Sequence, residues 1–410
     1  MAMIRSLSSS PPPAKRPRLD FSTKCTRPTS DFKGGLMLAP MVRSGSLPTR
    51  LFALKHGAKL VWGPEIVDKA LLHAERAVDP VSGTVHFNGV SKAIFSCHPI
   101  EKPYLIYQIG SADPELAVQA ARIIKDDVSG VDLNCGCPKP FSTHSGMGAA
   151  LLTNPDLLCS ILTALRNELP PHISVSAKIR LLPSQEDTLK LVKRIIDTGV
   201  SAITVHCRTR SMRPREKALI ERMREIVEYV EGLAVDVAII YNGDCQGYPD
   251  ARRVKEITRA HSIMIATAAE SNPTCFDPNP LTDLEHTLLP SYVQLARFLS
   301  IHWANTKFCI TQFKGPCPVT GKDKRKEIKE LISRTKSYEG LEDISGPWDG
   351  EMVLNEIQDI LKRRNDYLLI DESDKEEQWA GLPLSPHDTN QEIQKVNLLP
   401  SYEREIMIAS

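Results

Sequence analysis

The sequence lacks an excess of charge of either sign. It contains 51 Lys and Arg against 50 Asp and Glu, a formal net charge of +1. The overall charge therefore does not indicate a nucleic-acid partner, and any basic surface has to be local. The sequence also has no apolar run that approaches the ~20 residues of a membrane-spanning helix. We expect a soluble protein that does not enter membranes, and a monomer.

Motifs for metal binding or disulfide bonding are also missing. The ten cysteines are scattered over 410 residues, and Cys135 and Cys137 form a C-x-C pair without a C-x2-C or H-x3-H partner to complete a metal site. We therefore expect no metal ion. The chain is long enough to bury a core without disulfides and shows no apolar leader, which favours reduced thiols in the cytoplasm or the nucleus.

The two ends of the chain differ in composition from its middle. Residues 1–30 are rich in Ser and Pro, and residues 371–410 are polar and acidic, so we expect a disordered extension and a flexible tail. The AKRPR cluster at 14–18 is readable either as a nuclear-import signal or as an ordinary solvated basic run.

Between residues 31 and 283, short β-branched runs alternate with amphipathic stretches. No G-x-G-x-x-G follows the first run, which disfavours a dinucleotide-binding sheet, and eight strands are the number that closes a barrel. The sequence predicts an α/β fold, a (β/α)8 TIM barrel. The predicted strands are 36–40, 59–63, 104–109, 130–133, 174–180, 201–206, 237–242 and 263–268.

The helical pattern continues beyond the barrel without strand-like alternation. We predict barrel helices at 114–125, 154–168, 185–198 and 214–230. Residues 284–370 are predicted to form a small all-α domain, with helices at 289–308 and 322–336.

Polar residues gather at the ends of the predicted strands, where barrel enzymes carry their chemistry. Any one of them is readable as a satisfied structural polar group, but five on neighbouring strands favour a functional mouth. Gly243 follows the seventh strand, and Ala266 and Thr267 follow the eighth, at positions that frequently hold a phosphate. The five residues are Asn134, Lys178, His206, Arg208 and Asn242.

The two cysteines of VDLNCGCPK have different expected roles. Cys135 suits packing, since a free cysteine behaves as a small apolar side chain. Cys137 stands between Gly136 and Pro138, which permit a sharp turn and stop the strand. A thiol is mostly protonated at neutral pH, so Cys137 is a candidate general acid.

Several motifs in order give the sequence a specific resemblance. They are MLAPM at 37–41, NCGCP at 134–138, GMGAALL at 146–152, AKIR at 177–180, HCRTR at 206–210 and NGD at 242–244. Over roughly residues 35–330 the chain resembles the tRNA-dihydrouridine synthase family. The segments at 41–69 and 136–152 are similar to the eukaryotic branch that modifies position 20 of the D-loop.

The resemblance implies an NADPH-dependent flavoenzyme that reduces uridine in tRNA. FMN would lie across the barrel mouth and give hydride to C6 of uracil, with Cys137 protonating C5. Lys178 would offer a cation where negative charge develops on the reduced flavin. The implied FMN contacts are Ala39, Pro40, Met41, Gln108, Asn134, Lys178, His206, Asn242, Gly243, Asp244, Ala266 and Thr267.

The sequence departs from the family pattern at the phosphate end. An arginine usually follows Gly or Ala after the eighth strand, and Thr267 stands there instead. Loss of that bidentate cation is expected to weaken FMN affinity. Asp244, where the family often has Gly or Ser, is a smaller departure.

Two basic clusters are candidates for holding the tRNA backbone. Each is also readable as a solvated charged face, but the first lies beside the active rim, where the target uridine would have to leave its stack. The predicted substrate contacts are Arg180, Arg208, Arg210, Arg213 and Arg215, and the second cluster is Lys322, Lys324, Arg325, Lys326 and Lys329.

Three other functions are also compatible with the sequence. The chain is also compatible with an FMN barrel that acts on a small molecule, like a dihydroorotate dehydrogenase. A lyase in which Lys178 forms a Schiff base would lack a flavin spectrum. A catalytically weakened tRNA-binding homologue is suggested by Thr267.

Overall fold

The structure is a computed structural model and describes residues 29–213, 215–315 and 322–370. The basic AKRPR cluster and the acidic tail fall on residues outside these ranges. The described part begins with a short 3-10 helix, η1 (Thr29–Phe32), whose Phe32 is buried against Trp62.

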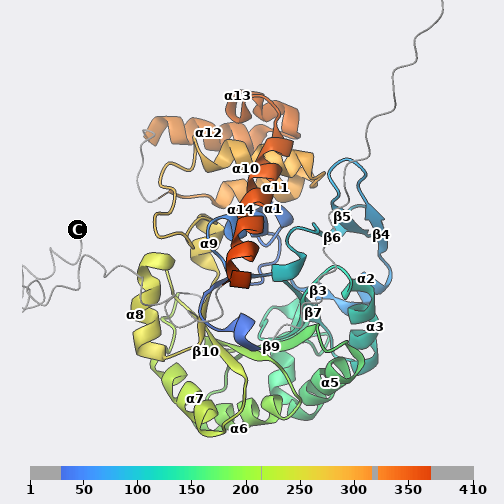
Figure 1. Cartoon of the computed structure of the whole chain (residues 1–410), viewed down its shortest axis with the longest axis vertical. Coiled ribbons are helices and arrows are strands. Elements are labelled where there is room, and N and C mark those ends of the chain that lie inside the picture. The colour runs from blue at the N-terminus through green and yellow to red at the C-terminus, as the bar shows by residue number, and fades with distance from the viewer. Residues whose placement is uncertain (1–28, 214, 316–321, 371–410) are drawn as a thin grey trace, which may run out of the picture.

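Eight parallel strands close into a barrel, which confirms the predicted TIM-barrel fold (Figure 1). Each strand pairs with the next one around the ring, and the pairing of the second strand with the third completes the closure. Most strand residues are buried, as expected for a parallel sheet covered by helices. The strands are β1 (Leu36–Leu38), β2 (Leu60–Trp62), β7 (Leu105–Gly110), β8 (Gly130–Cys135), β9 (Ser174–Leu181), β10 (Ala202–Thr209), β11 (Ala238–Asn242) and β12 (Ser262–Ile265).

The outer helices turn apolar stripes toward this barrel, and several begin at the capping residues that the sequence provides. Asp113 caps α3 by accepting from two backbone N–H groups, and Asn154 and Ser184 cap α5 and α6. The helices are α3 (Pro114–Ile124), α5 (Pro155–Glu168), α6 (Gln185–Ile196), α7 (Glu221–Gly232) and α8 (Tyr248–Thr258).

A three-stranded antiparallel sheet interrupts the barrel after its second strand, and the sequence reading did not predict it. β4 (Glu75–Val78), β5 (Val85–Asn88) and β6 (Ala93–Cys97) pair in order beside the barrel mouth. Between β2 and this sheet, the short β3 (Ile66–Val67) pairs with the end of β7, and the short helix α2 (Asp68–Leu72) follows it.

Helices from the C-terminal part gather over one side of the barrel (Figure 1). They pack on α1 (Leu47–Lys55), which is buried along almost its whole length because it lies between the barrel and these helices. Phe52 stacks on Tyr292, with ring centroids 5.8 Å apart. The helices are α10 (Leu288–Phe298), α11 (Trp303–Gln312), α12 (Lys322–Arg334), α13 (Glu342–Ser345) and α14 (Gly350–Ile370), with η4 (Tyr338–Leu341) before α13.

The single helix predicted at 289–308 is wrong, because the chain forms α10 and α11 instead. Ser300 adopts a left-handed conformation (φ 55°). The N–H groups of Ser300 and Ile301 close back onto the carbonyls of Arg297 and Ala296, the pattern of a Schellman motif. The motif usually carries glycine at this position, so the sequence shows no sign of the break.

The helix predicted at 214–230 is also wrong at its start. α7 begins at Glu221, and residue 214 lies outside the described ranges. Ala218 donates its N–H to the Asp244 carboxylate, and the carbonyl of Glu216 accepts from Arg208. These side-chain bonds take the backbone groups that a helix would have used.

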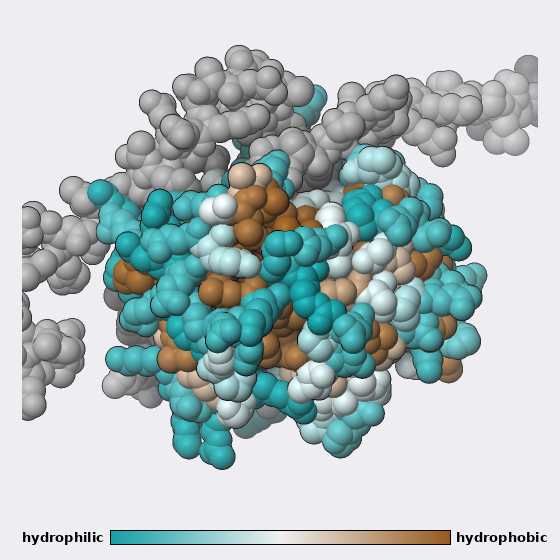
Figure 2. Space-filling model, turned by 90° about the horizontal axis from the view of Figure 1, so that it is seen from below, coloured by the Kyte–Doolittle hydropathy of each residue, from teal (hydrophilic) through white to brown (hydrophobic). Residues whose placement is uncertain are grey.

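Seen from below, the surface is mostly hydrophilic, with apolar side chains showing between polar ones (Figure 2). This is the appearance expected when amphipathic helices turn their apolar faces inward. Within the ranges that the structure describes, no helix is both long and apolar enough to cross a membrane.

A buried ion pair joins α1 to the chain that leads into β7, and we predict a large cost for breaking it. Arg50 donates to both carboxylate oxygens of Glu101 at 2.7 and 2.9 Å, and both side chains are almost fully buried. Arg50→Leu leaves a buried carboxylate unpaired, so it should lower the free energy of unfolding by about 3–5 kcal/mol. The measurement is urea denaturation.

Two comparisons test the physical reason. The double variant Arg50→Leu/Glu101→Leu should recover part of the loss, since no charge is then left alone. Lys55→Met removes the more exposed pair with Glu356 and should cost less than about 1 kcal/mol. Equal losses for Arg50→Leu and Lys55→Met would contradict the assignment.

Candidate active site

The strand register brings the predicted polar residues together at the carboxyl ends of the barrel strands. Asn134 on β8 pairs with Lys178 on β9. Two residues further along β9, Arg180 pairs with His206 on β10, and His206 pairs with Asn242 on β11. These three residues therefore lie in one row across the sheet. Alternate residues of a strand share one face, so Lys178 and Arg180 both point into the mouth.

The turn that carries Cys137 is held by the side chain of Asn134. Its carboxamide oxygen accepts from the N–H groups of Gly136 and Cys137, at 2.9 and 3.0 Å. Arg180 donates to the carbonyl of Gly136 at 2.8 Å, and the carbonyl of Cys137 accepts from Ala149 N–H at 2.9 Å. The thiol therefore stands on a backbone fixed from three sides.

Gly148 makes room behind this turn and explains one glycine of the GMGAALL motif. Its φ of 59° favours glycine. A Cβ there would lie 2.7 Å from the carbonyl oxygen of Cys137 and 2.4 Å from Ser142 Oγ. A larger residue would push the cysteine out of place.

The two cysteines have different environments and form no disulfide. Cys135 is fully buried and its thiol points to the carbonyl of Leu133 at 3.6 Å, whereas Cys137 is half-buried at the mouth. Burial raises the pKa of Cys137, with the nearby Glu65 carboxyl acting in the same direction and Lys139 opposing it. The Cys137 thiol thus stays protonated at neutral pH.

A network of buried polar side chains lies beneath the mouth. Gln108 donates to Asp132 at 2.8 Å and accepts from Asn134 at 3.3 Å. Ser176 donates to the other oxygen of Asp132 at 2.7 Å. Burial raises the pKa of Asp132 to about 6, against the effect of these hydrogen bonds. The network fixes the amide orientations of Gln108 and Asn134.

Lys178 and His206 carry opposite proton states within one cationic cluster. Burial lowers the pKa of Lys178 to about 8, and Arg180 adds to this. Lys178 is therefore still mostly charged at neutral pH, and its ammonium makes no hydrogen bond or salt bridge with any described residue. Burial and the charges of Lys178, Arg180 and Arg208 lower the pKa of His206 to about 2. His206 is neutral.

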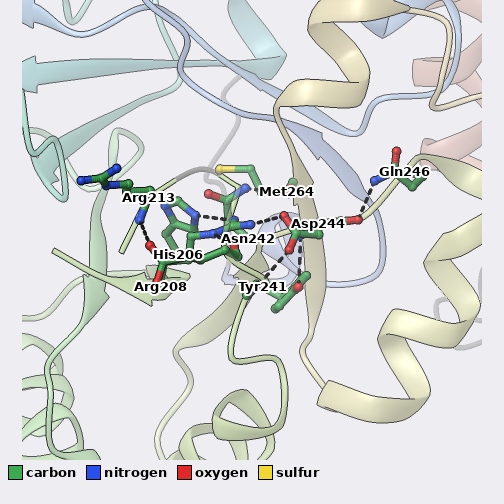
Figure 3. Close-up of polar contacts among 10 residues, drawn as sticks. His206, Arg208, Arg213, Tyr241, Asn242, Asp244, Gln246 and Met264 are labelled. Carbon is green, nitrogen blue, oxygen red and sulfur yellow. Dashed lines mark hydrogen bonds and ion pairs between the residues drawn. The ribbon is translucent and has the colours of Figure 1, made fainter. Parts of the chain in front are cut away.

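The tautomer of His206 follows from its neighbour. Its Nε2 lies 3.2 Å from Arg208 Nη1 (Figure 3). A guanidinium group only donates, so Nε2 accepts and the ring proton lies on Nδ1. His206 can offer that proton as a neutral hydrogen-bond donor.

Arg208 and Asp244, predicted as substrate and cofactor contacts, form an ion pair with each other. Arg208 is 6% exposed and its Nη2 lies 2.6 Å from Asp244 Oδ1. Asp244 also accepts from Ala218 N–H at 2.8 Å. The pair ties the loop after β10 to the loop after β11 and leaves Arg208 beneath the rim.

The remaining predicted cofactor residues line the opposite part of the mouth. Asn242 is buried and donates to the carbonyl of Met264 at 2.9 Å. Gly243 follows it at the end of β11, and a Cβ there would collide with the Tyr241 hydroxyl. Ala266 and the exposed Thr267 begin the short helix α9 (Thr267–Ser271) after β12. The loop after β1 contributes Ala39, Pro40 and Met41.

Arg210, Arg213 and Arg215 differ from Arg208 because they are exposed. Their guanidinium groups make no hydrogen bond or ion pair within the described ranges. Arg213 points away from His206 and Arg208 (Figure 3). Of the second predicted cluster, Lys326 and Lys329 are exposed on α12, and Lys326 forms an ion pair with Glu330 at 4.0 Å. The three exposed arginines are available to an anionic partner.

Glu65 is a site residue that the sequence reading missed. It follows β2 at the carboxyl end of the barrel, is 8% exposed, and hydrogen-bonds with Ser142 Oγ at 3.3 Å. Burial raises its pKa, and the neighbouring side chains of Cys137, Ser142 and Asn134 oppose this rise. In the sequence it is a single glutamate after W-G-P, and no motif or spacing marks it as a site residue.

The chain forms a TIM barrel whose polar groups lie at the carboxyl ends of the strands, the place where barrel enzymes carry their active sites. A family model described as dihydrouridine synthase (Dus) matches residues 37–345. The chain belongs to the dihydrouridine synthase family, as the sequence motifs predicted.

Curated relatives carry related names. The chain is 47% identical over 319 residues to a Schizosaccharomyces pombe protein named tRNA-dihydrouridine(20) synthase [NAD(P)+], covering 76% of this chain and 64% of that one. It is 43% identical over 309 residues to the Saccharomyces cerevisiae protein of the same name, covering 68% of this chain and 77% of that one. A Saccharomyces cerevisiae protein named tRNA-dihydrouridine(20a/20b) synthase [NAD(P)+] is 26% identical, covering 74% and 77%.

The Arg208–Asp244 pair is predicted to hold the loop at 210–220 in place. Arg208→Met removes a buried charged hydrogen bond of about 1.5–3 kcal/mol, so local opening should rise about tenfold or more. Hydrogen exchange of peptides from this loop would show it, with peptides of β9 unchanged. Arg215→Met, which removes an exposed cation, is the matched control. Unchanged exchange in Arg208→Met would contradict the role of the pair.

Proposed function

We propose that the protein is an FMN- and NADPH-dependent tRNA-dihydrouridine synthase that reduces the uridine at position 20 of the D-loop. Membership of the dihydrouridine synthase family and the names of the similar yeast proteins support the reaction and the position. The observation that carries the proposal is the half-buried Cys137 thiol at the barrel mouth, whose pKa is raised by burial.

The mouth offers polar groups that suit a flavin ring. The Lys178 ammonium has no ion-pair partner among the described residues, and the buried Thr204 Oγ1 lacks a hydrogen-bond partner there. Unsatisfied groups of this kind fit a polar ring bound across the mouth. Bound FMN would supply the hydride for C6 of uracil. Lys178 would hold negative charge on the flavin, and His206 would donate from Nδ1.

Cys137 would complete the reaction from the other side of the ring. Its S–H bond breaks as the proton goes to C5, which leaves a thiolate. A general acid has to be protonated before it acts, and the raised pKa of Cys137 meets that need.

The exposed arginines suit the backbone of a folded RNA. Arg210, Arg213 and Arg215 stand beside the mouth without protein partners in the described part of the chain, so they can neutralise phosphates. Lys326 and Lys329 extend the basic surface on α12. A uridine in an RNA loop can be turned out of its stack to enter the mouth.

The proposed reaction is tested with purified protein, FMN, NADPH and an unmodified tRNA transcript. Cys137→Ala should keep binding of FMN and tRNA and lose about 10²-fold or more of dihydrouridine formation, because the proton donor is gone. Cys135→Ala, a substitution at the buried neighbour, should have a far smaller effect. Wild-type turnover in Cys137→Ala would overturn the role of the thiol.

A second prediction concerns the phosphate end. Thr267→Arg restores a bidentate cation at an exposed position, so the dissociation constant for FMN should fall about tenfold, as expected for a charge-assisted hydrogen bond. Fluorescence titration of the flavin-free protein measures it, with Thr267→Ala as the control. Equal affinities of Thr267→Arg and wild type would show that the absent arginine is not what limits FMN binding.

A further inference from the structure

Glu65 is a buried carboxyl group with unused hydrogen-bonding capacity. Its Oε1 accepts from Ser142 Oγ at 3.3 Å, while the buried Oε2 has no hydrogen-bond partner among the described residues. A Cβ at Gly110 would lie 2.7 Å from Oε1, so the end of β7 is kept bare to admit this carboxyl. A cost of this kind indicates a role beyond packing.

The carboxyl stands next to the thiol. The Cys137 and Glu65 side chains each shift the pKa of the other, and Ser142 Oγ lies 3.3 Å from Glu65 Oε1 beside the Cys137 turn. This close packing requires glycine at position 148, because a Cβ there would lie 3.1 Å from Cys137 Cβ and 2.4 Å from Ser142 Oγ. The Cys137 turn, Ser142 and Glu65 thus form one packed unit.

Glu65 also takes part in a cleft that opens at the surface. It lines a cleft of about 710 Å³ between the barrel mouth, the β4–β6 sheet and the loop before α11. His86 and Arg50 line the same cleft. A group that touches both the thiol and this cleft can carry protons between them.

The proposed reaction creates a need for such a group. Each turnover leaves Cys137 as a thiolate, and a nucleotide bound in the mouth would cover its exposed side. We propose, resting on the proposed function, that Glu65 is a proton relay that restores the Cys137 thiol from the water of the cleft. The Glu65 O–H bond breaks as the S–H bond forms, and the carboxylate then takes a proton from water. Glu65 acts through Cys137 and does not touch the substrate.

The proton balance at Glu65 depends on its surroundings. Cys135, Cys137 and Lys139 face it from β8 and the loop after it, Gly110 of β7 brings no charge, and Arg50 across the cleft is paired with Glu101. Burial is the largest cause that raises the pKa of Glu65, with Lys139 opposing. A raised pKa keeps more of the carboxyl protonated as pH rises. Turnover limited by the relay should fall as pH passes that pKa.

The test separates one turnover from many. Glu65→Gln should leave a single turnover, with reduced enzyme in excess over tRNA, close to wild type, because Cys137 already holds its proton. Steady-state turnover should fall about tenfold or more and lose its decline on the alkaline side of the Glu65 pKa. Glu65→Asp should restore part of it. Glu75→Gln, at an exposed position on β4, is the matched control.

A second measurement reports on the Cys137 thiol without enzyme turnover. Alkylation of Cys137 by iodoacetamide, followed by mass spectrometry of its peptide, should titrate at lower pH in Glu65→Gln, since a group that raises the thiol pKa is gone. Equal losses in single and multiple turnover, or an unchanged pH profile, would overturn the relay and leave the proposed function standing. A wild-type protein that forms no dihydrouridine would instead overturn the proposed function.

Discussion

The site depends on one side chain, the carboxamide of Asn134 at the end of β8. Its oxygen accepts two successive backbone N–H groups, and this forces the chain to turn just where the barrel strand ends. The turn directs Cys135 into the packed wall and Cys137 to the mouth. Gln108 and Asp132 orient the amide from beneath. Two cysteines separated by one residue thereby acquire unrelated environments.

Burial then sets the proton state of each group around this turn. Desolvation is the largest cause in every case, but it acts in opposite senses on acids and bases. It raises the pKa of Cys137 and Glu65, which keeps their protons, and lowers that of His206, which keeps it neutral. Lys178 remains the cation of the set. One barrel mouth thus holds proton donors, a neutral histidine and a positive charge together.

Sequence reasoning found the barrel because short apolar or alternating runs occur between helical stretches, as in the buried strand at 238–242. It missed the β4–β6 sheet, whose strand Glu75–Val78 is mostly exposed and has little apolar character. It could not see the helix break at Ser300, since only the backbone angle marks it. These features depend on tertiary contacts and backbone angles that composition does not record.

The same limit applies within the site. The sequence identified Asn134, Lys178 and His206 from their places at strand ends, but it grouped Arg208 with the exposed arginines. Only the fold shows that Arg208 is paired with Asp244, 36 positions away. Glu65 likewise contacts the site through Ser142, which is 77 positions away in the sequence. Contacts over such distances have no local pattern.

We propose that this barrel mouth reduces one D-loop uridine in tRNA, and a map of dihydrouridine on tRNA from a strain that lacks the protein would test this. We expect loss of dihydrouridine at position 20 and its return when the wild-type chain is supplied. Dihydrouridine that persists at position 20 in the strain without the protein would contradict it.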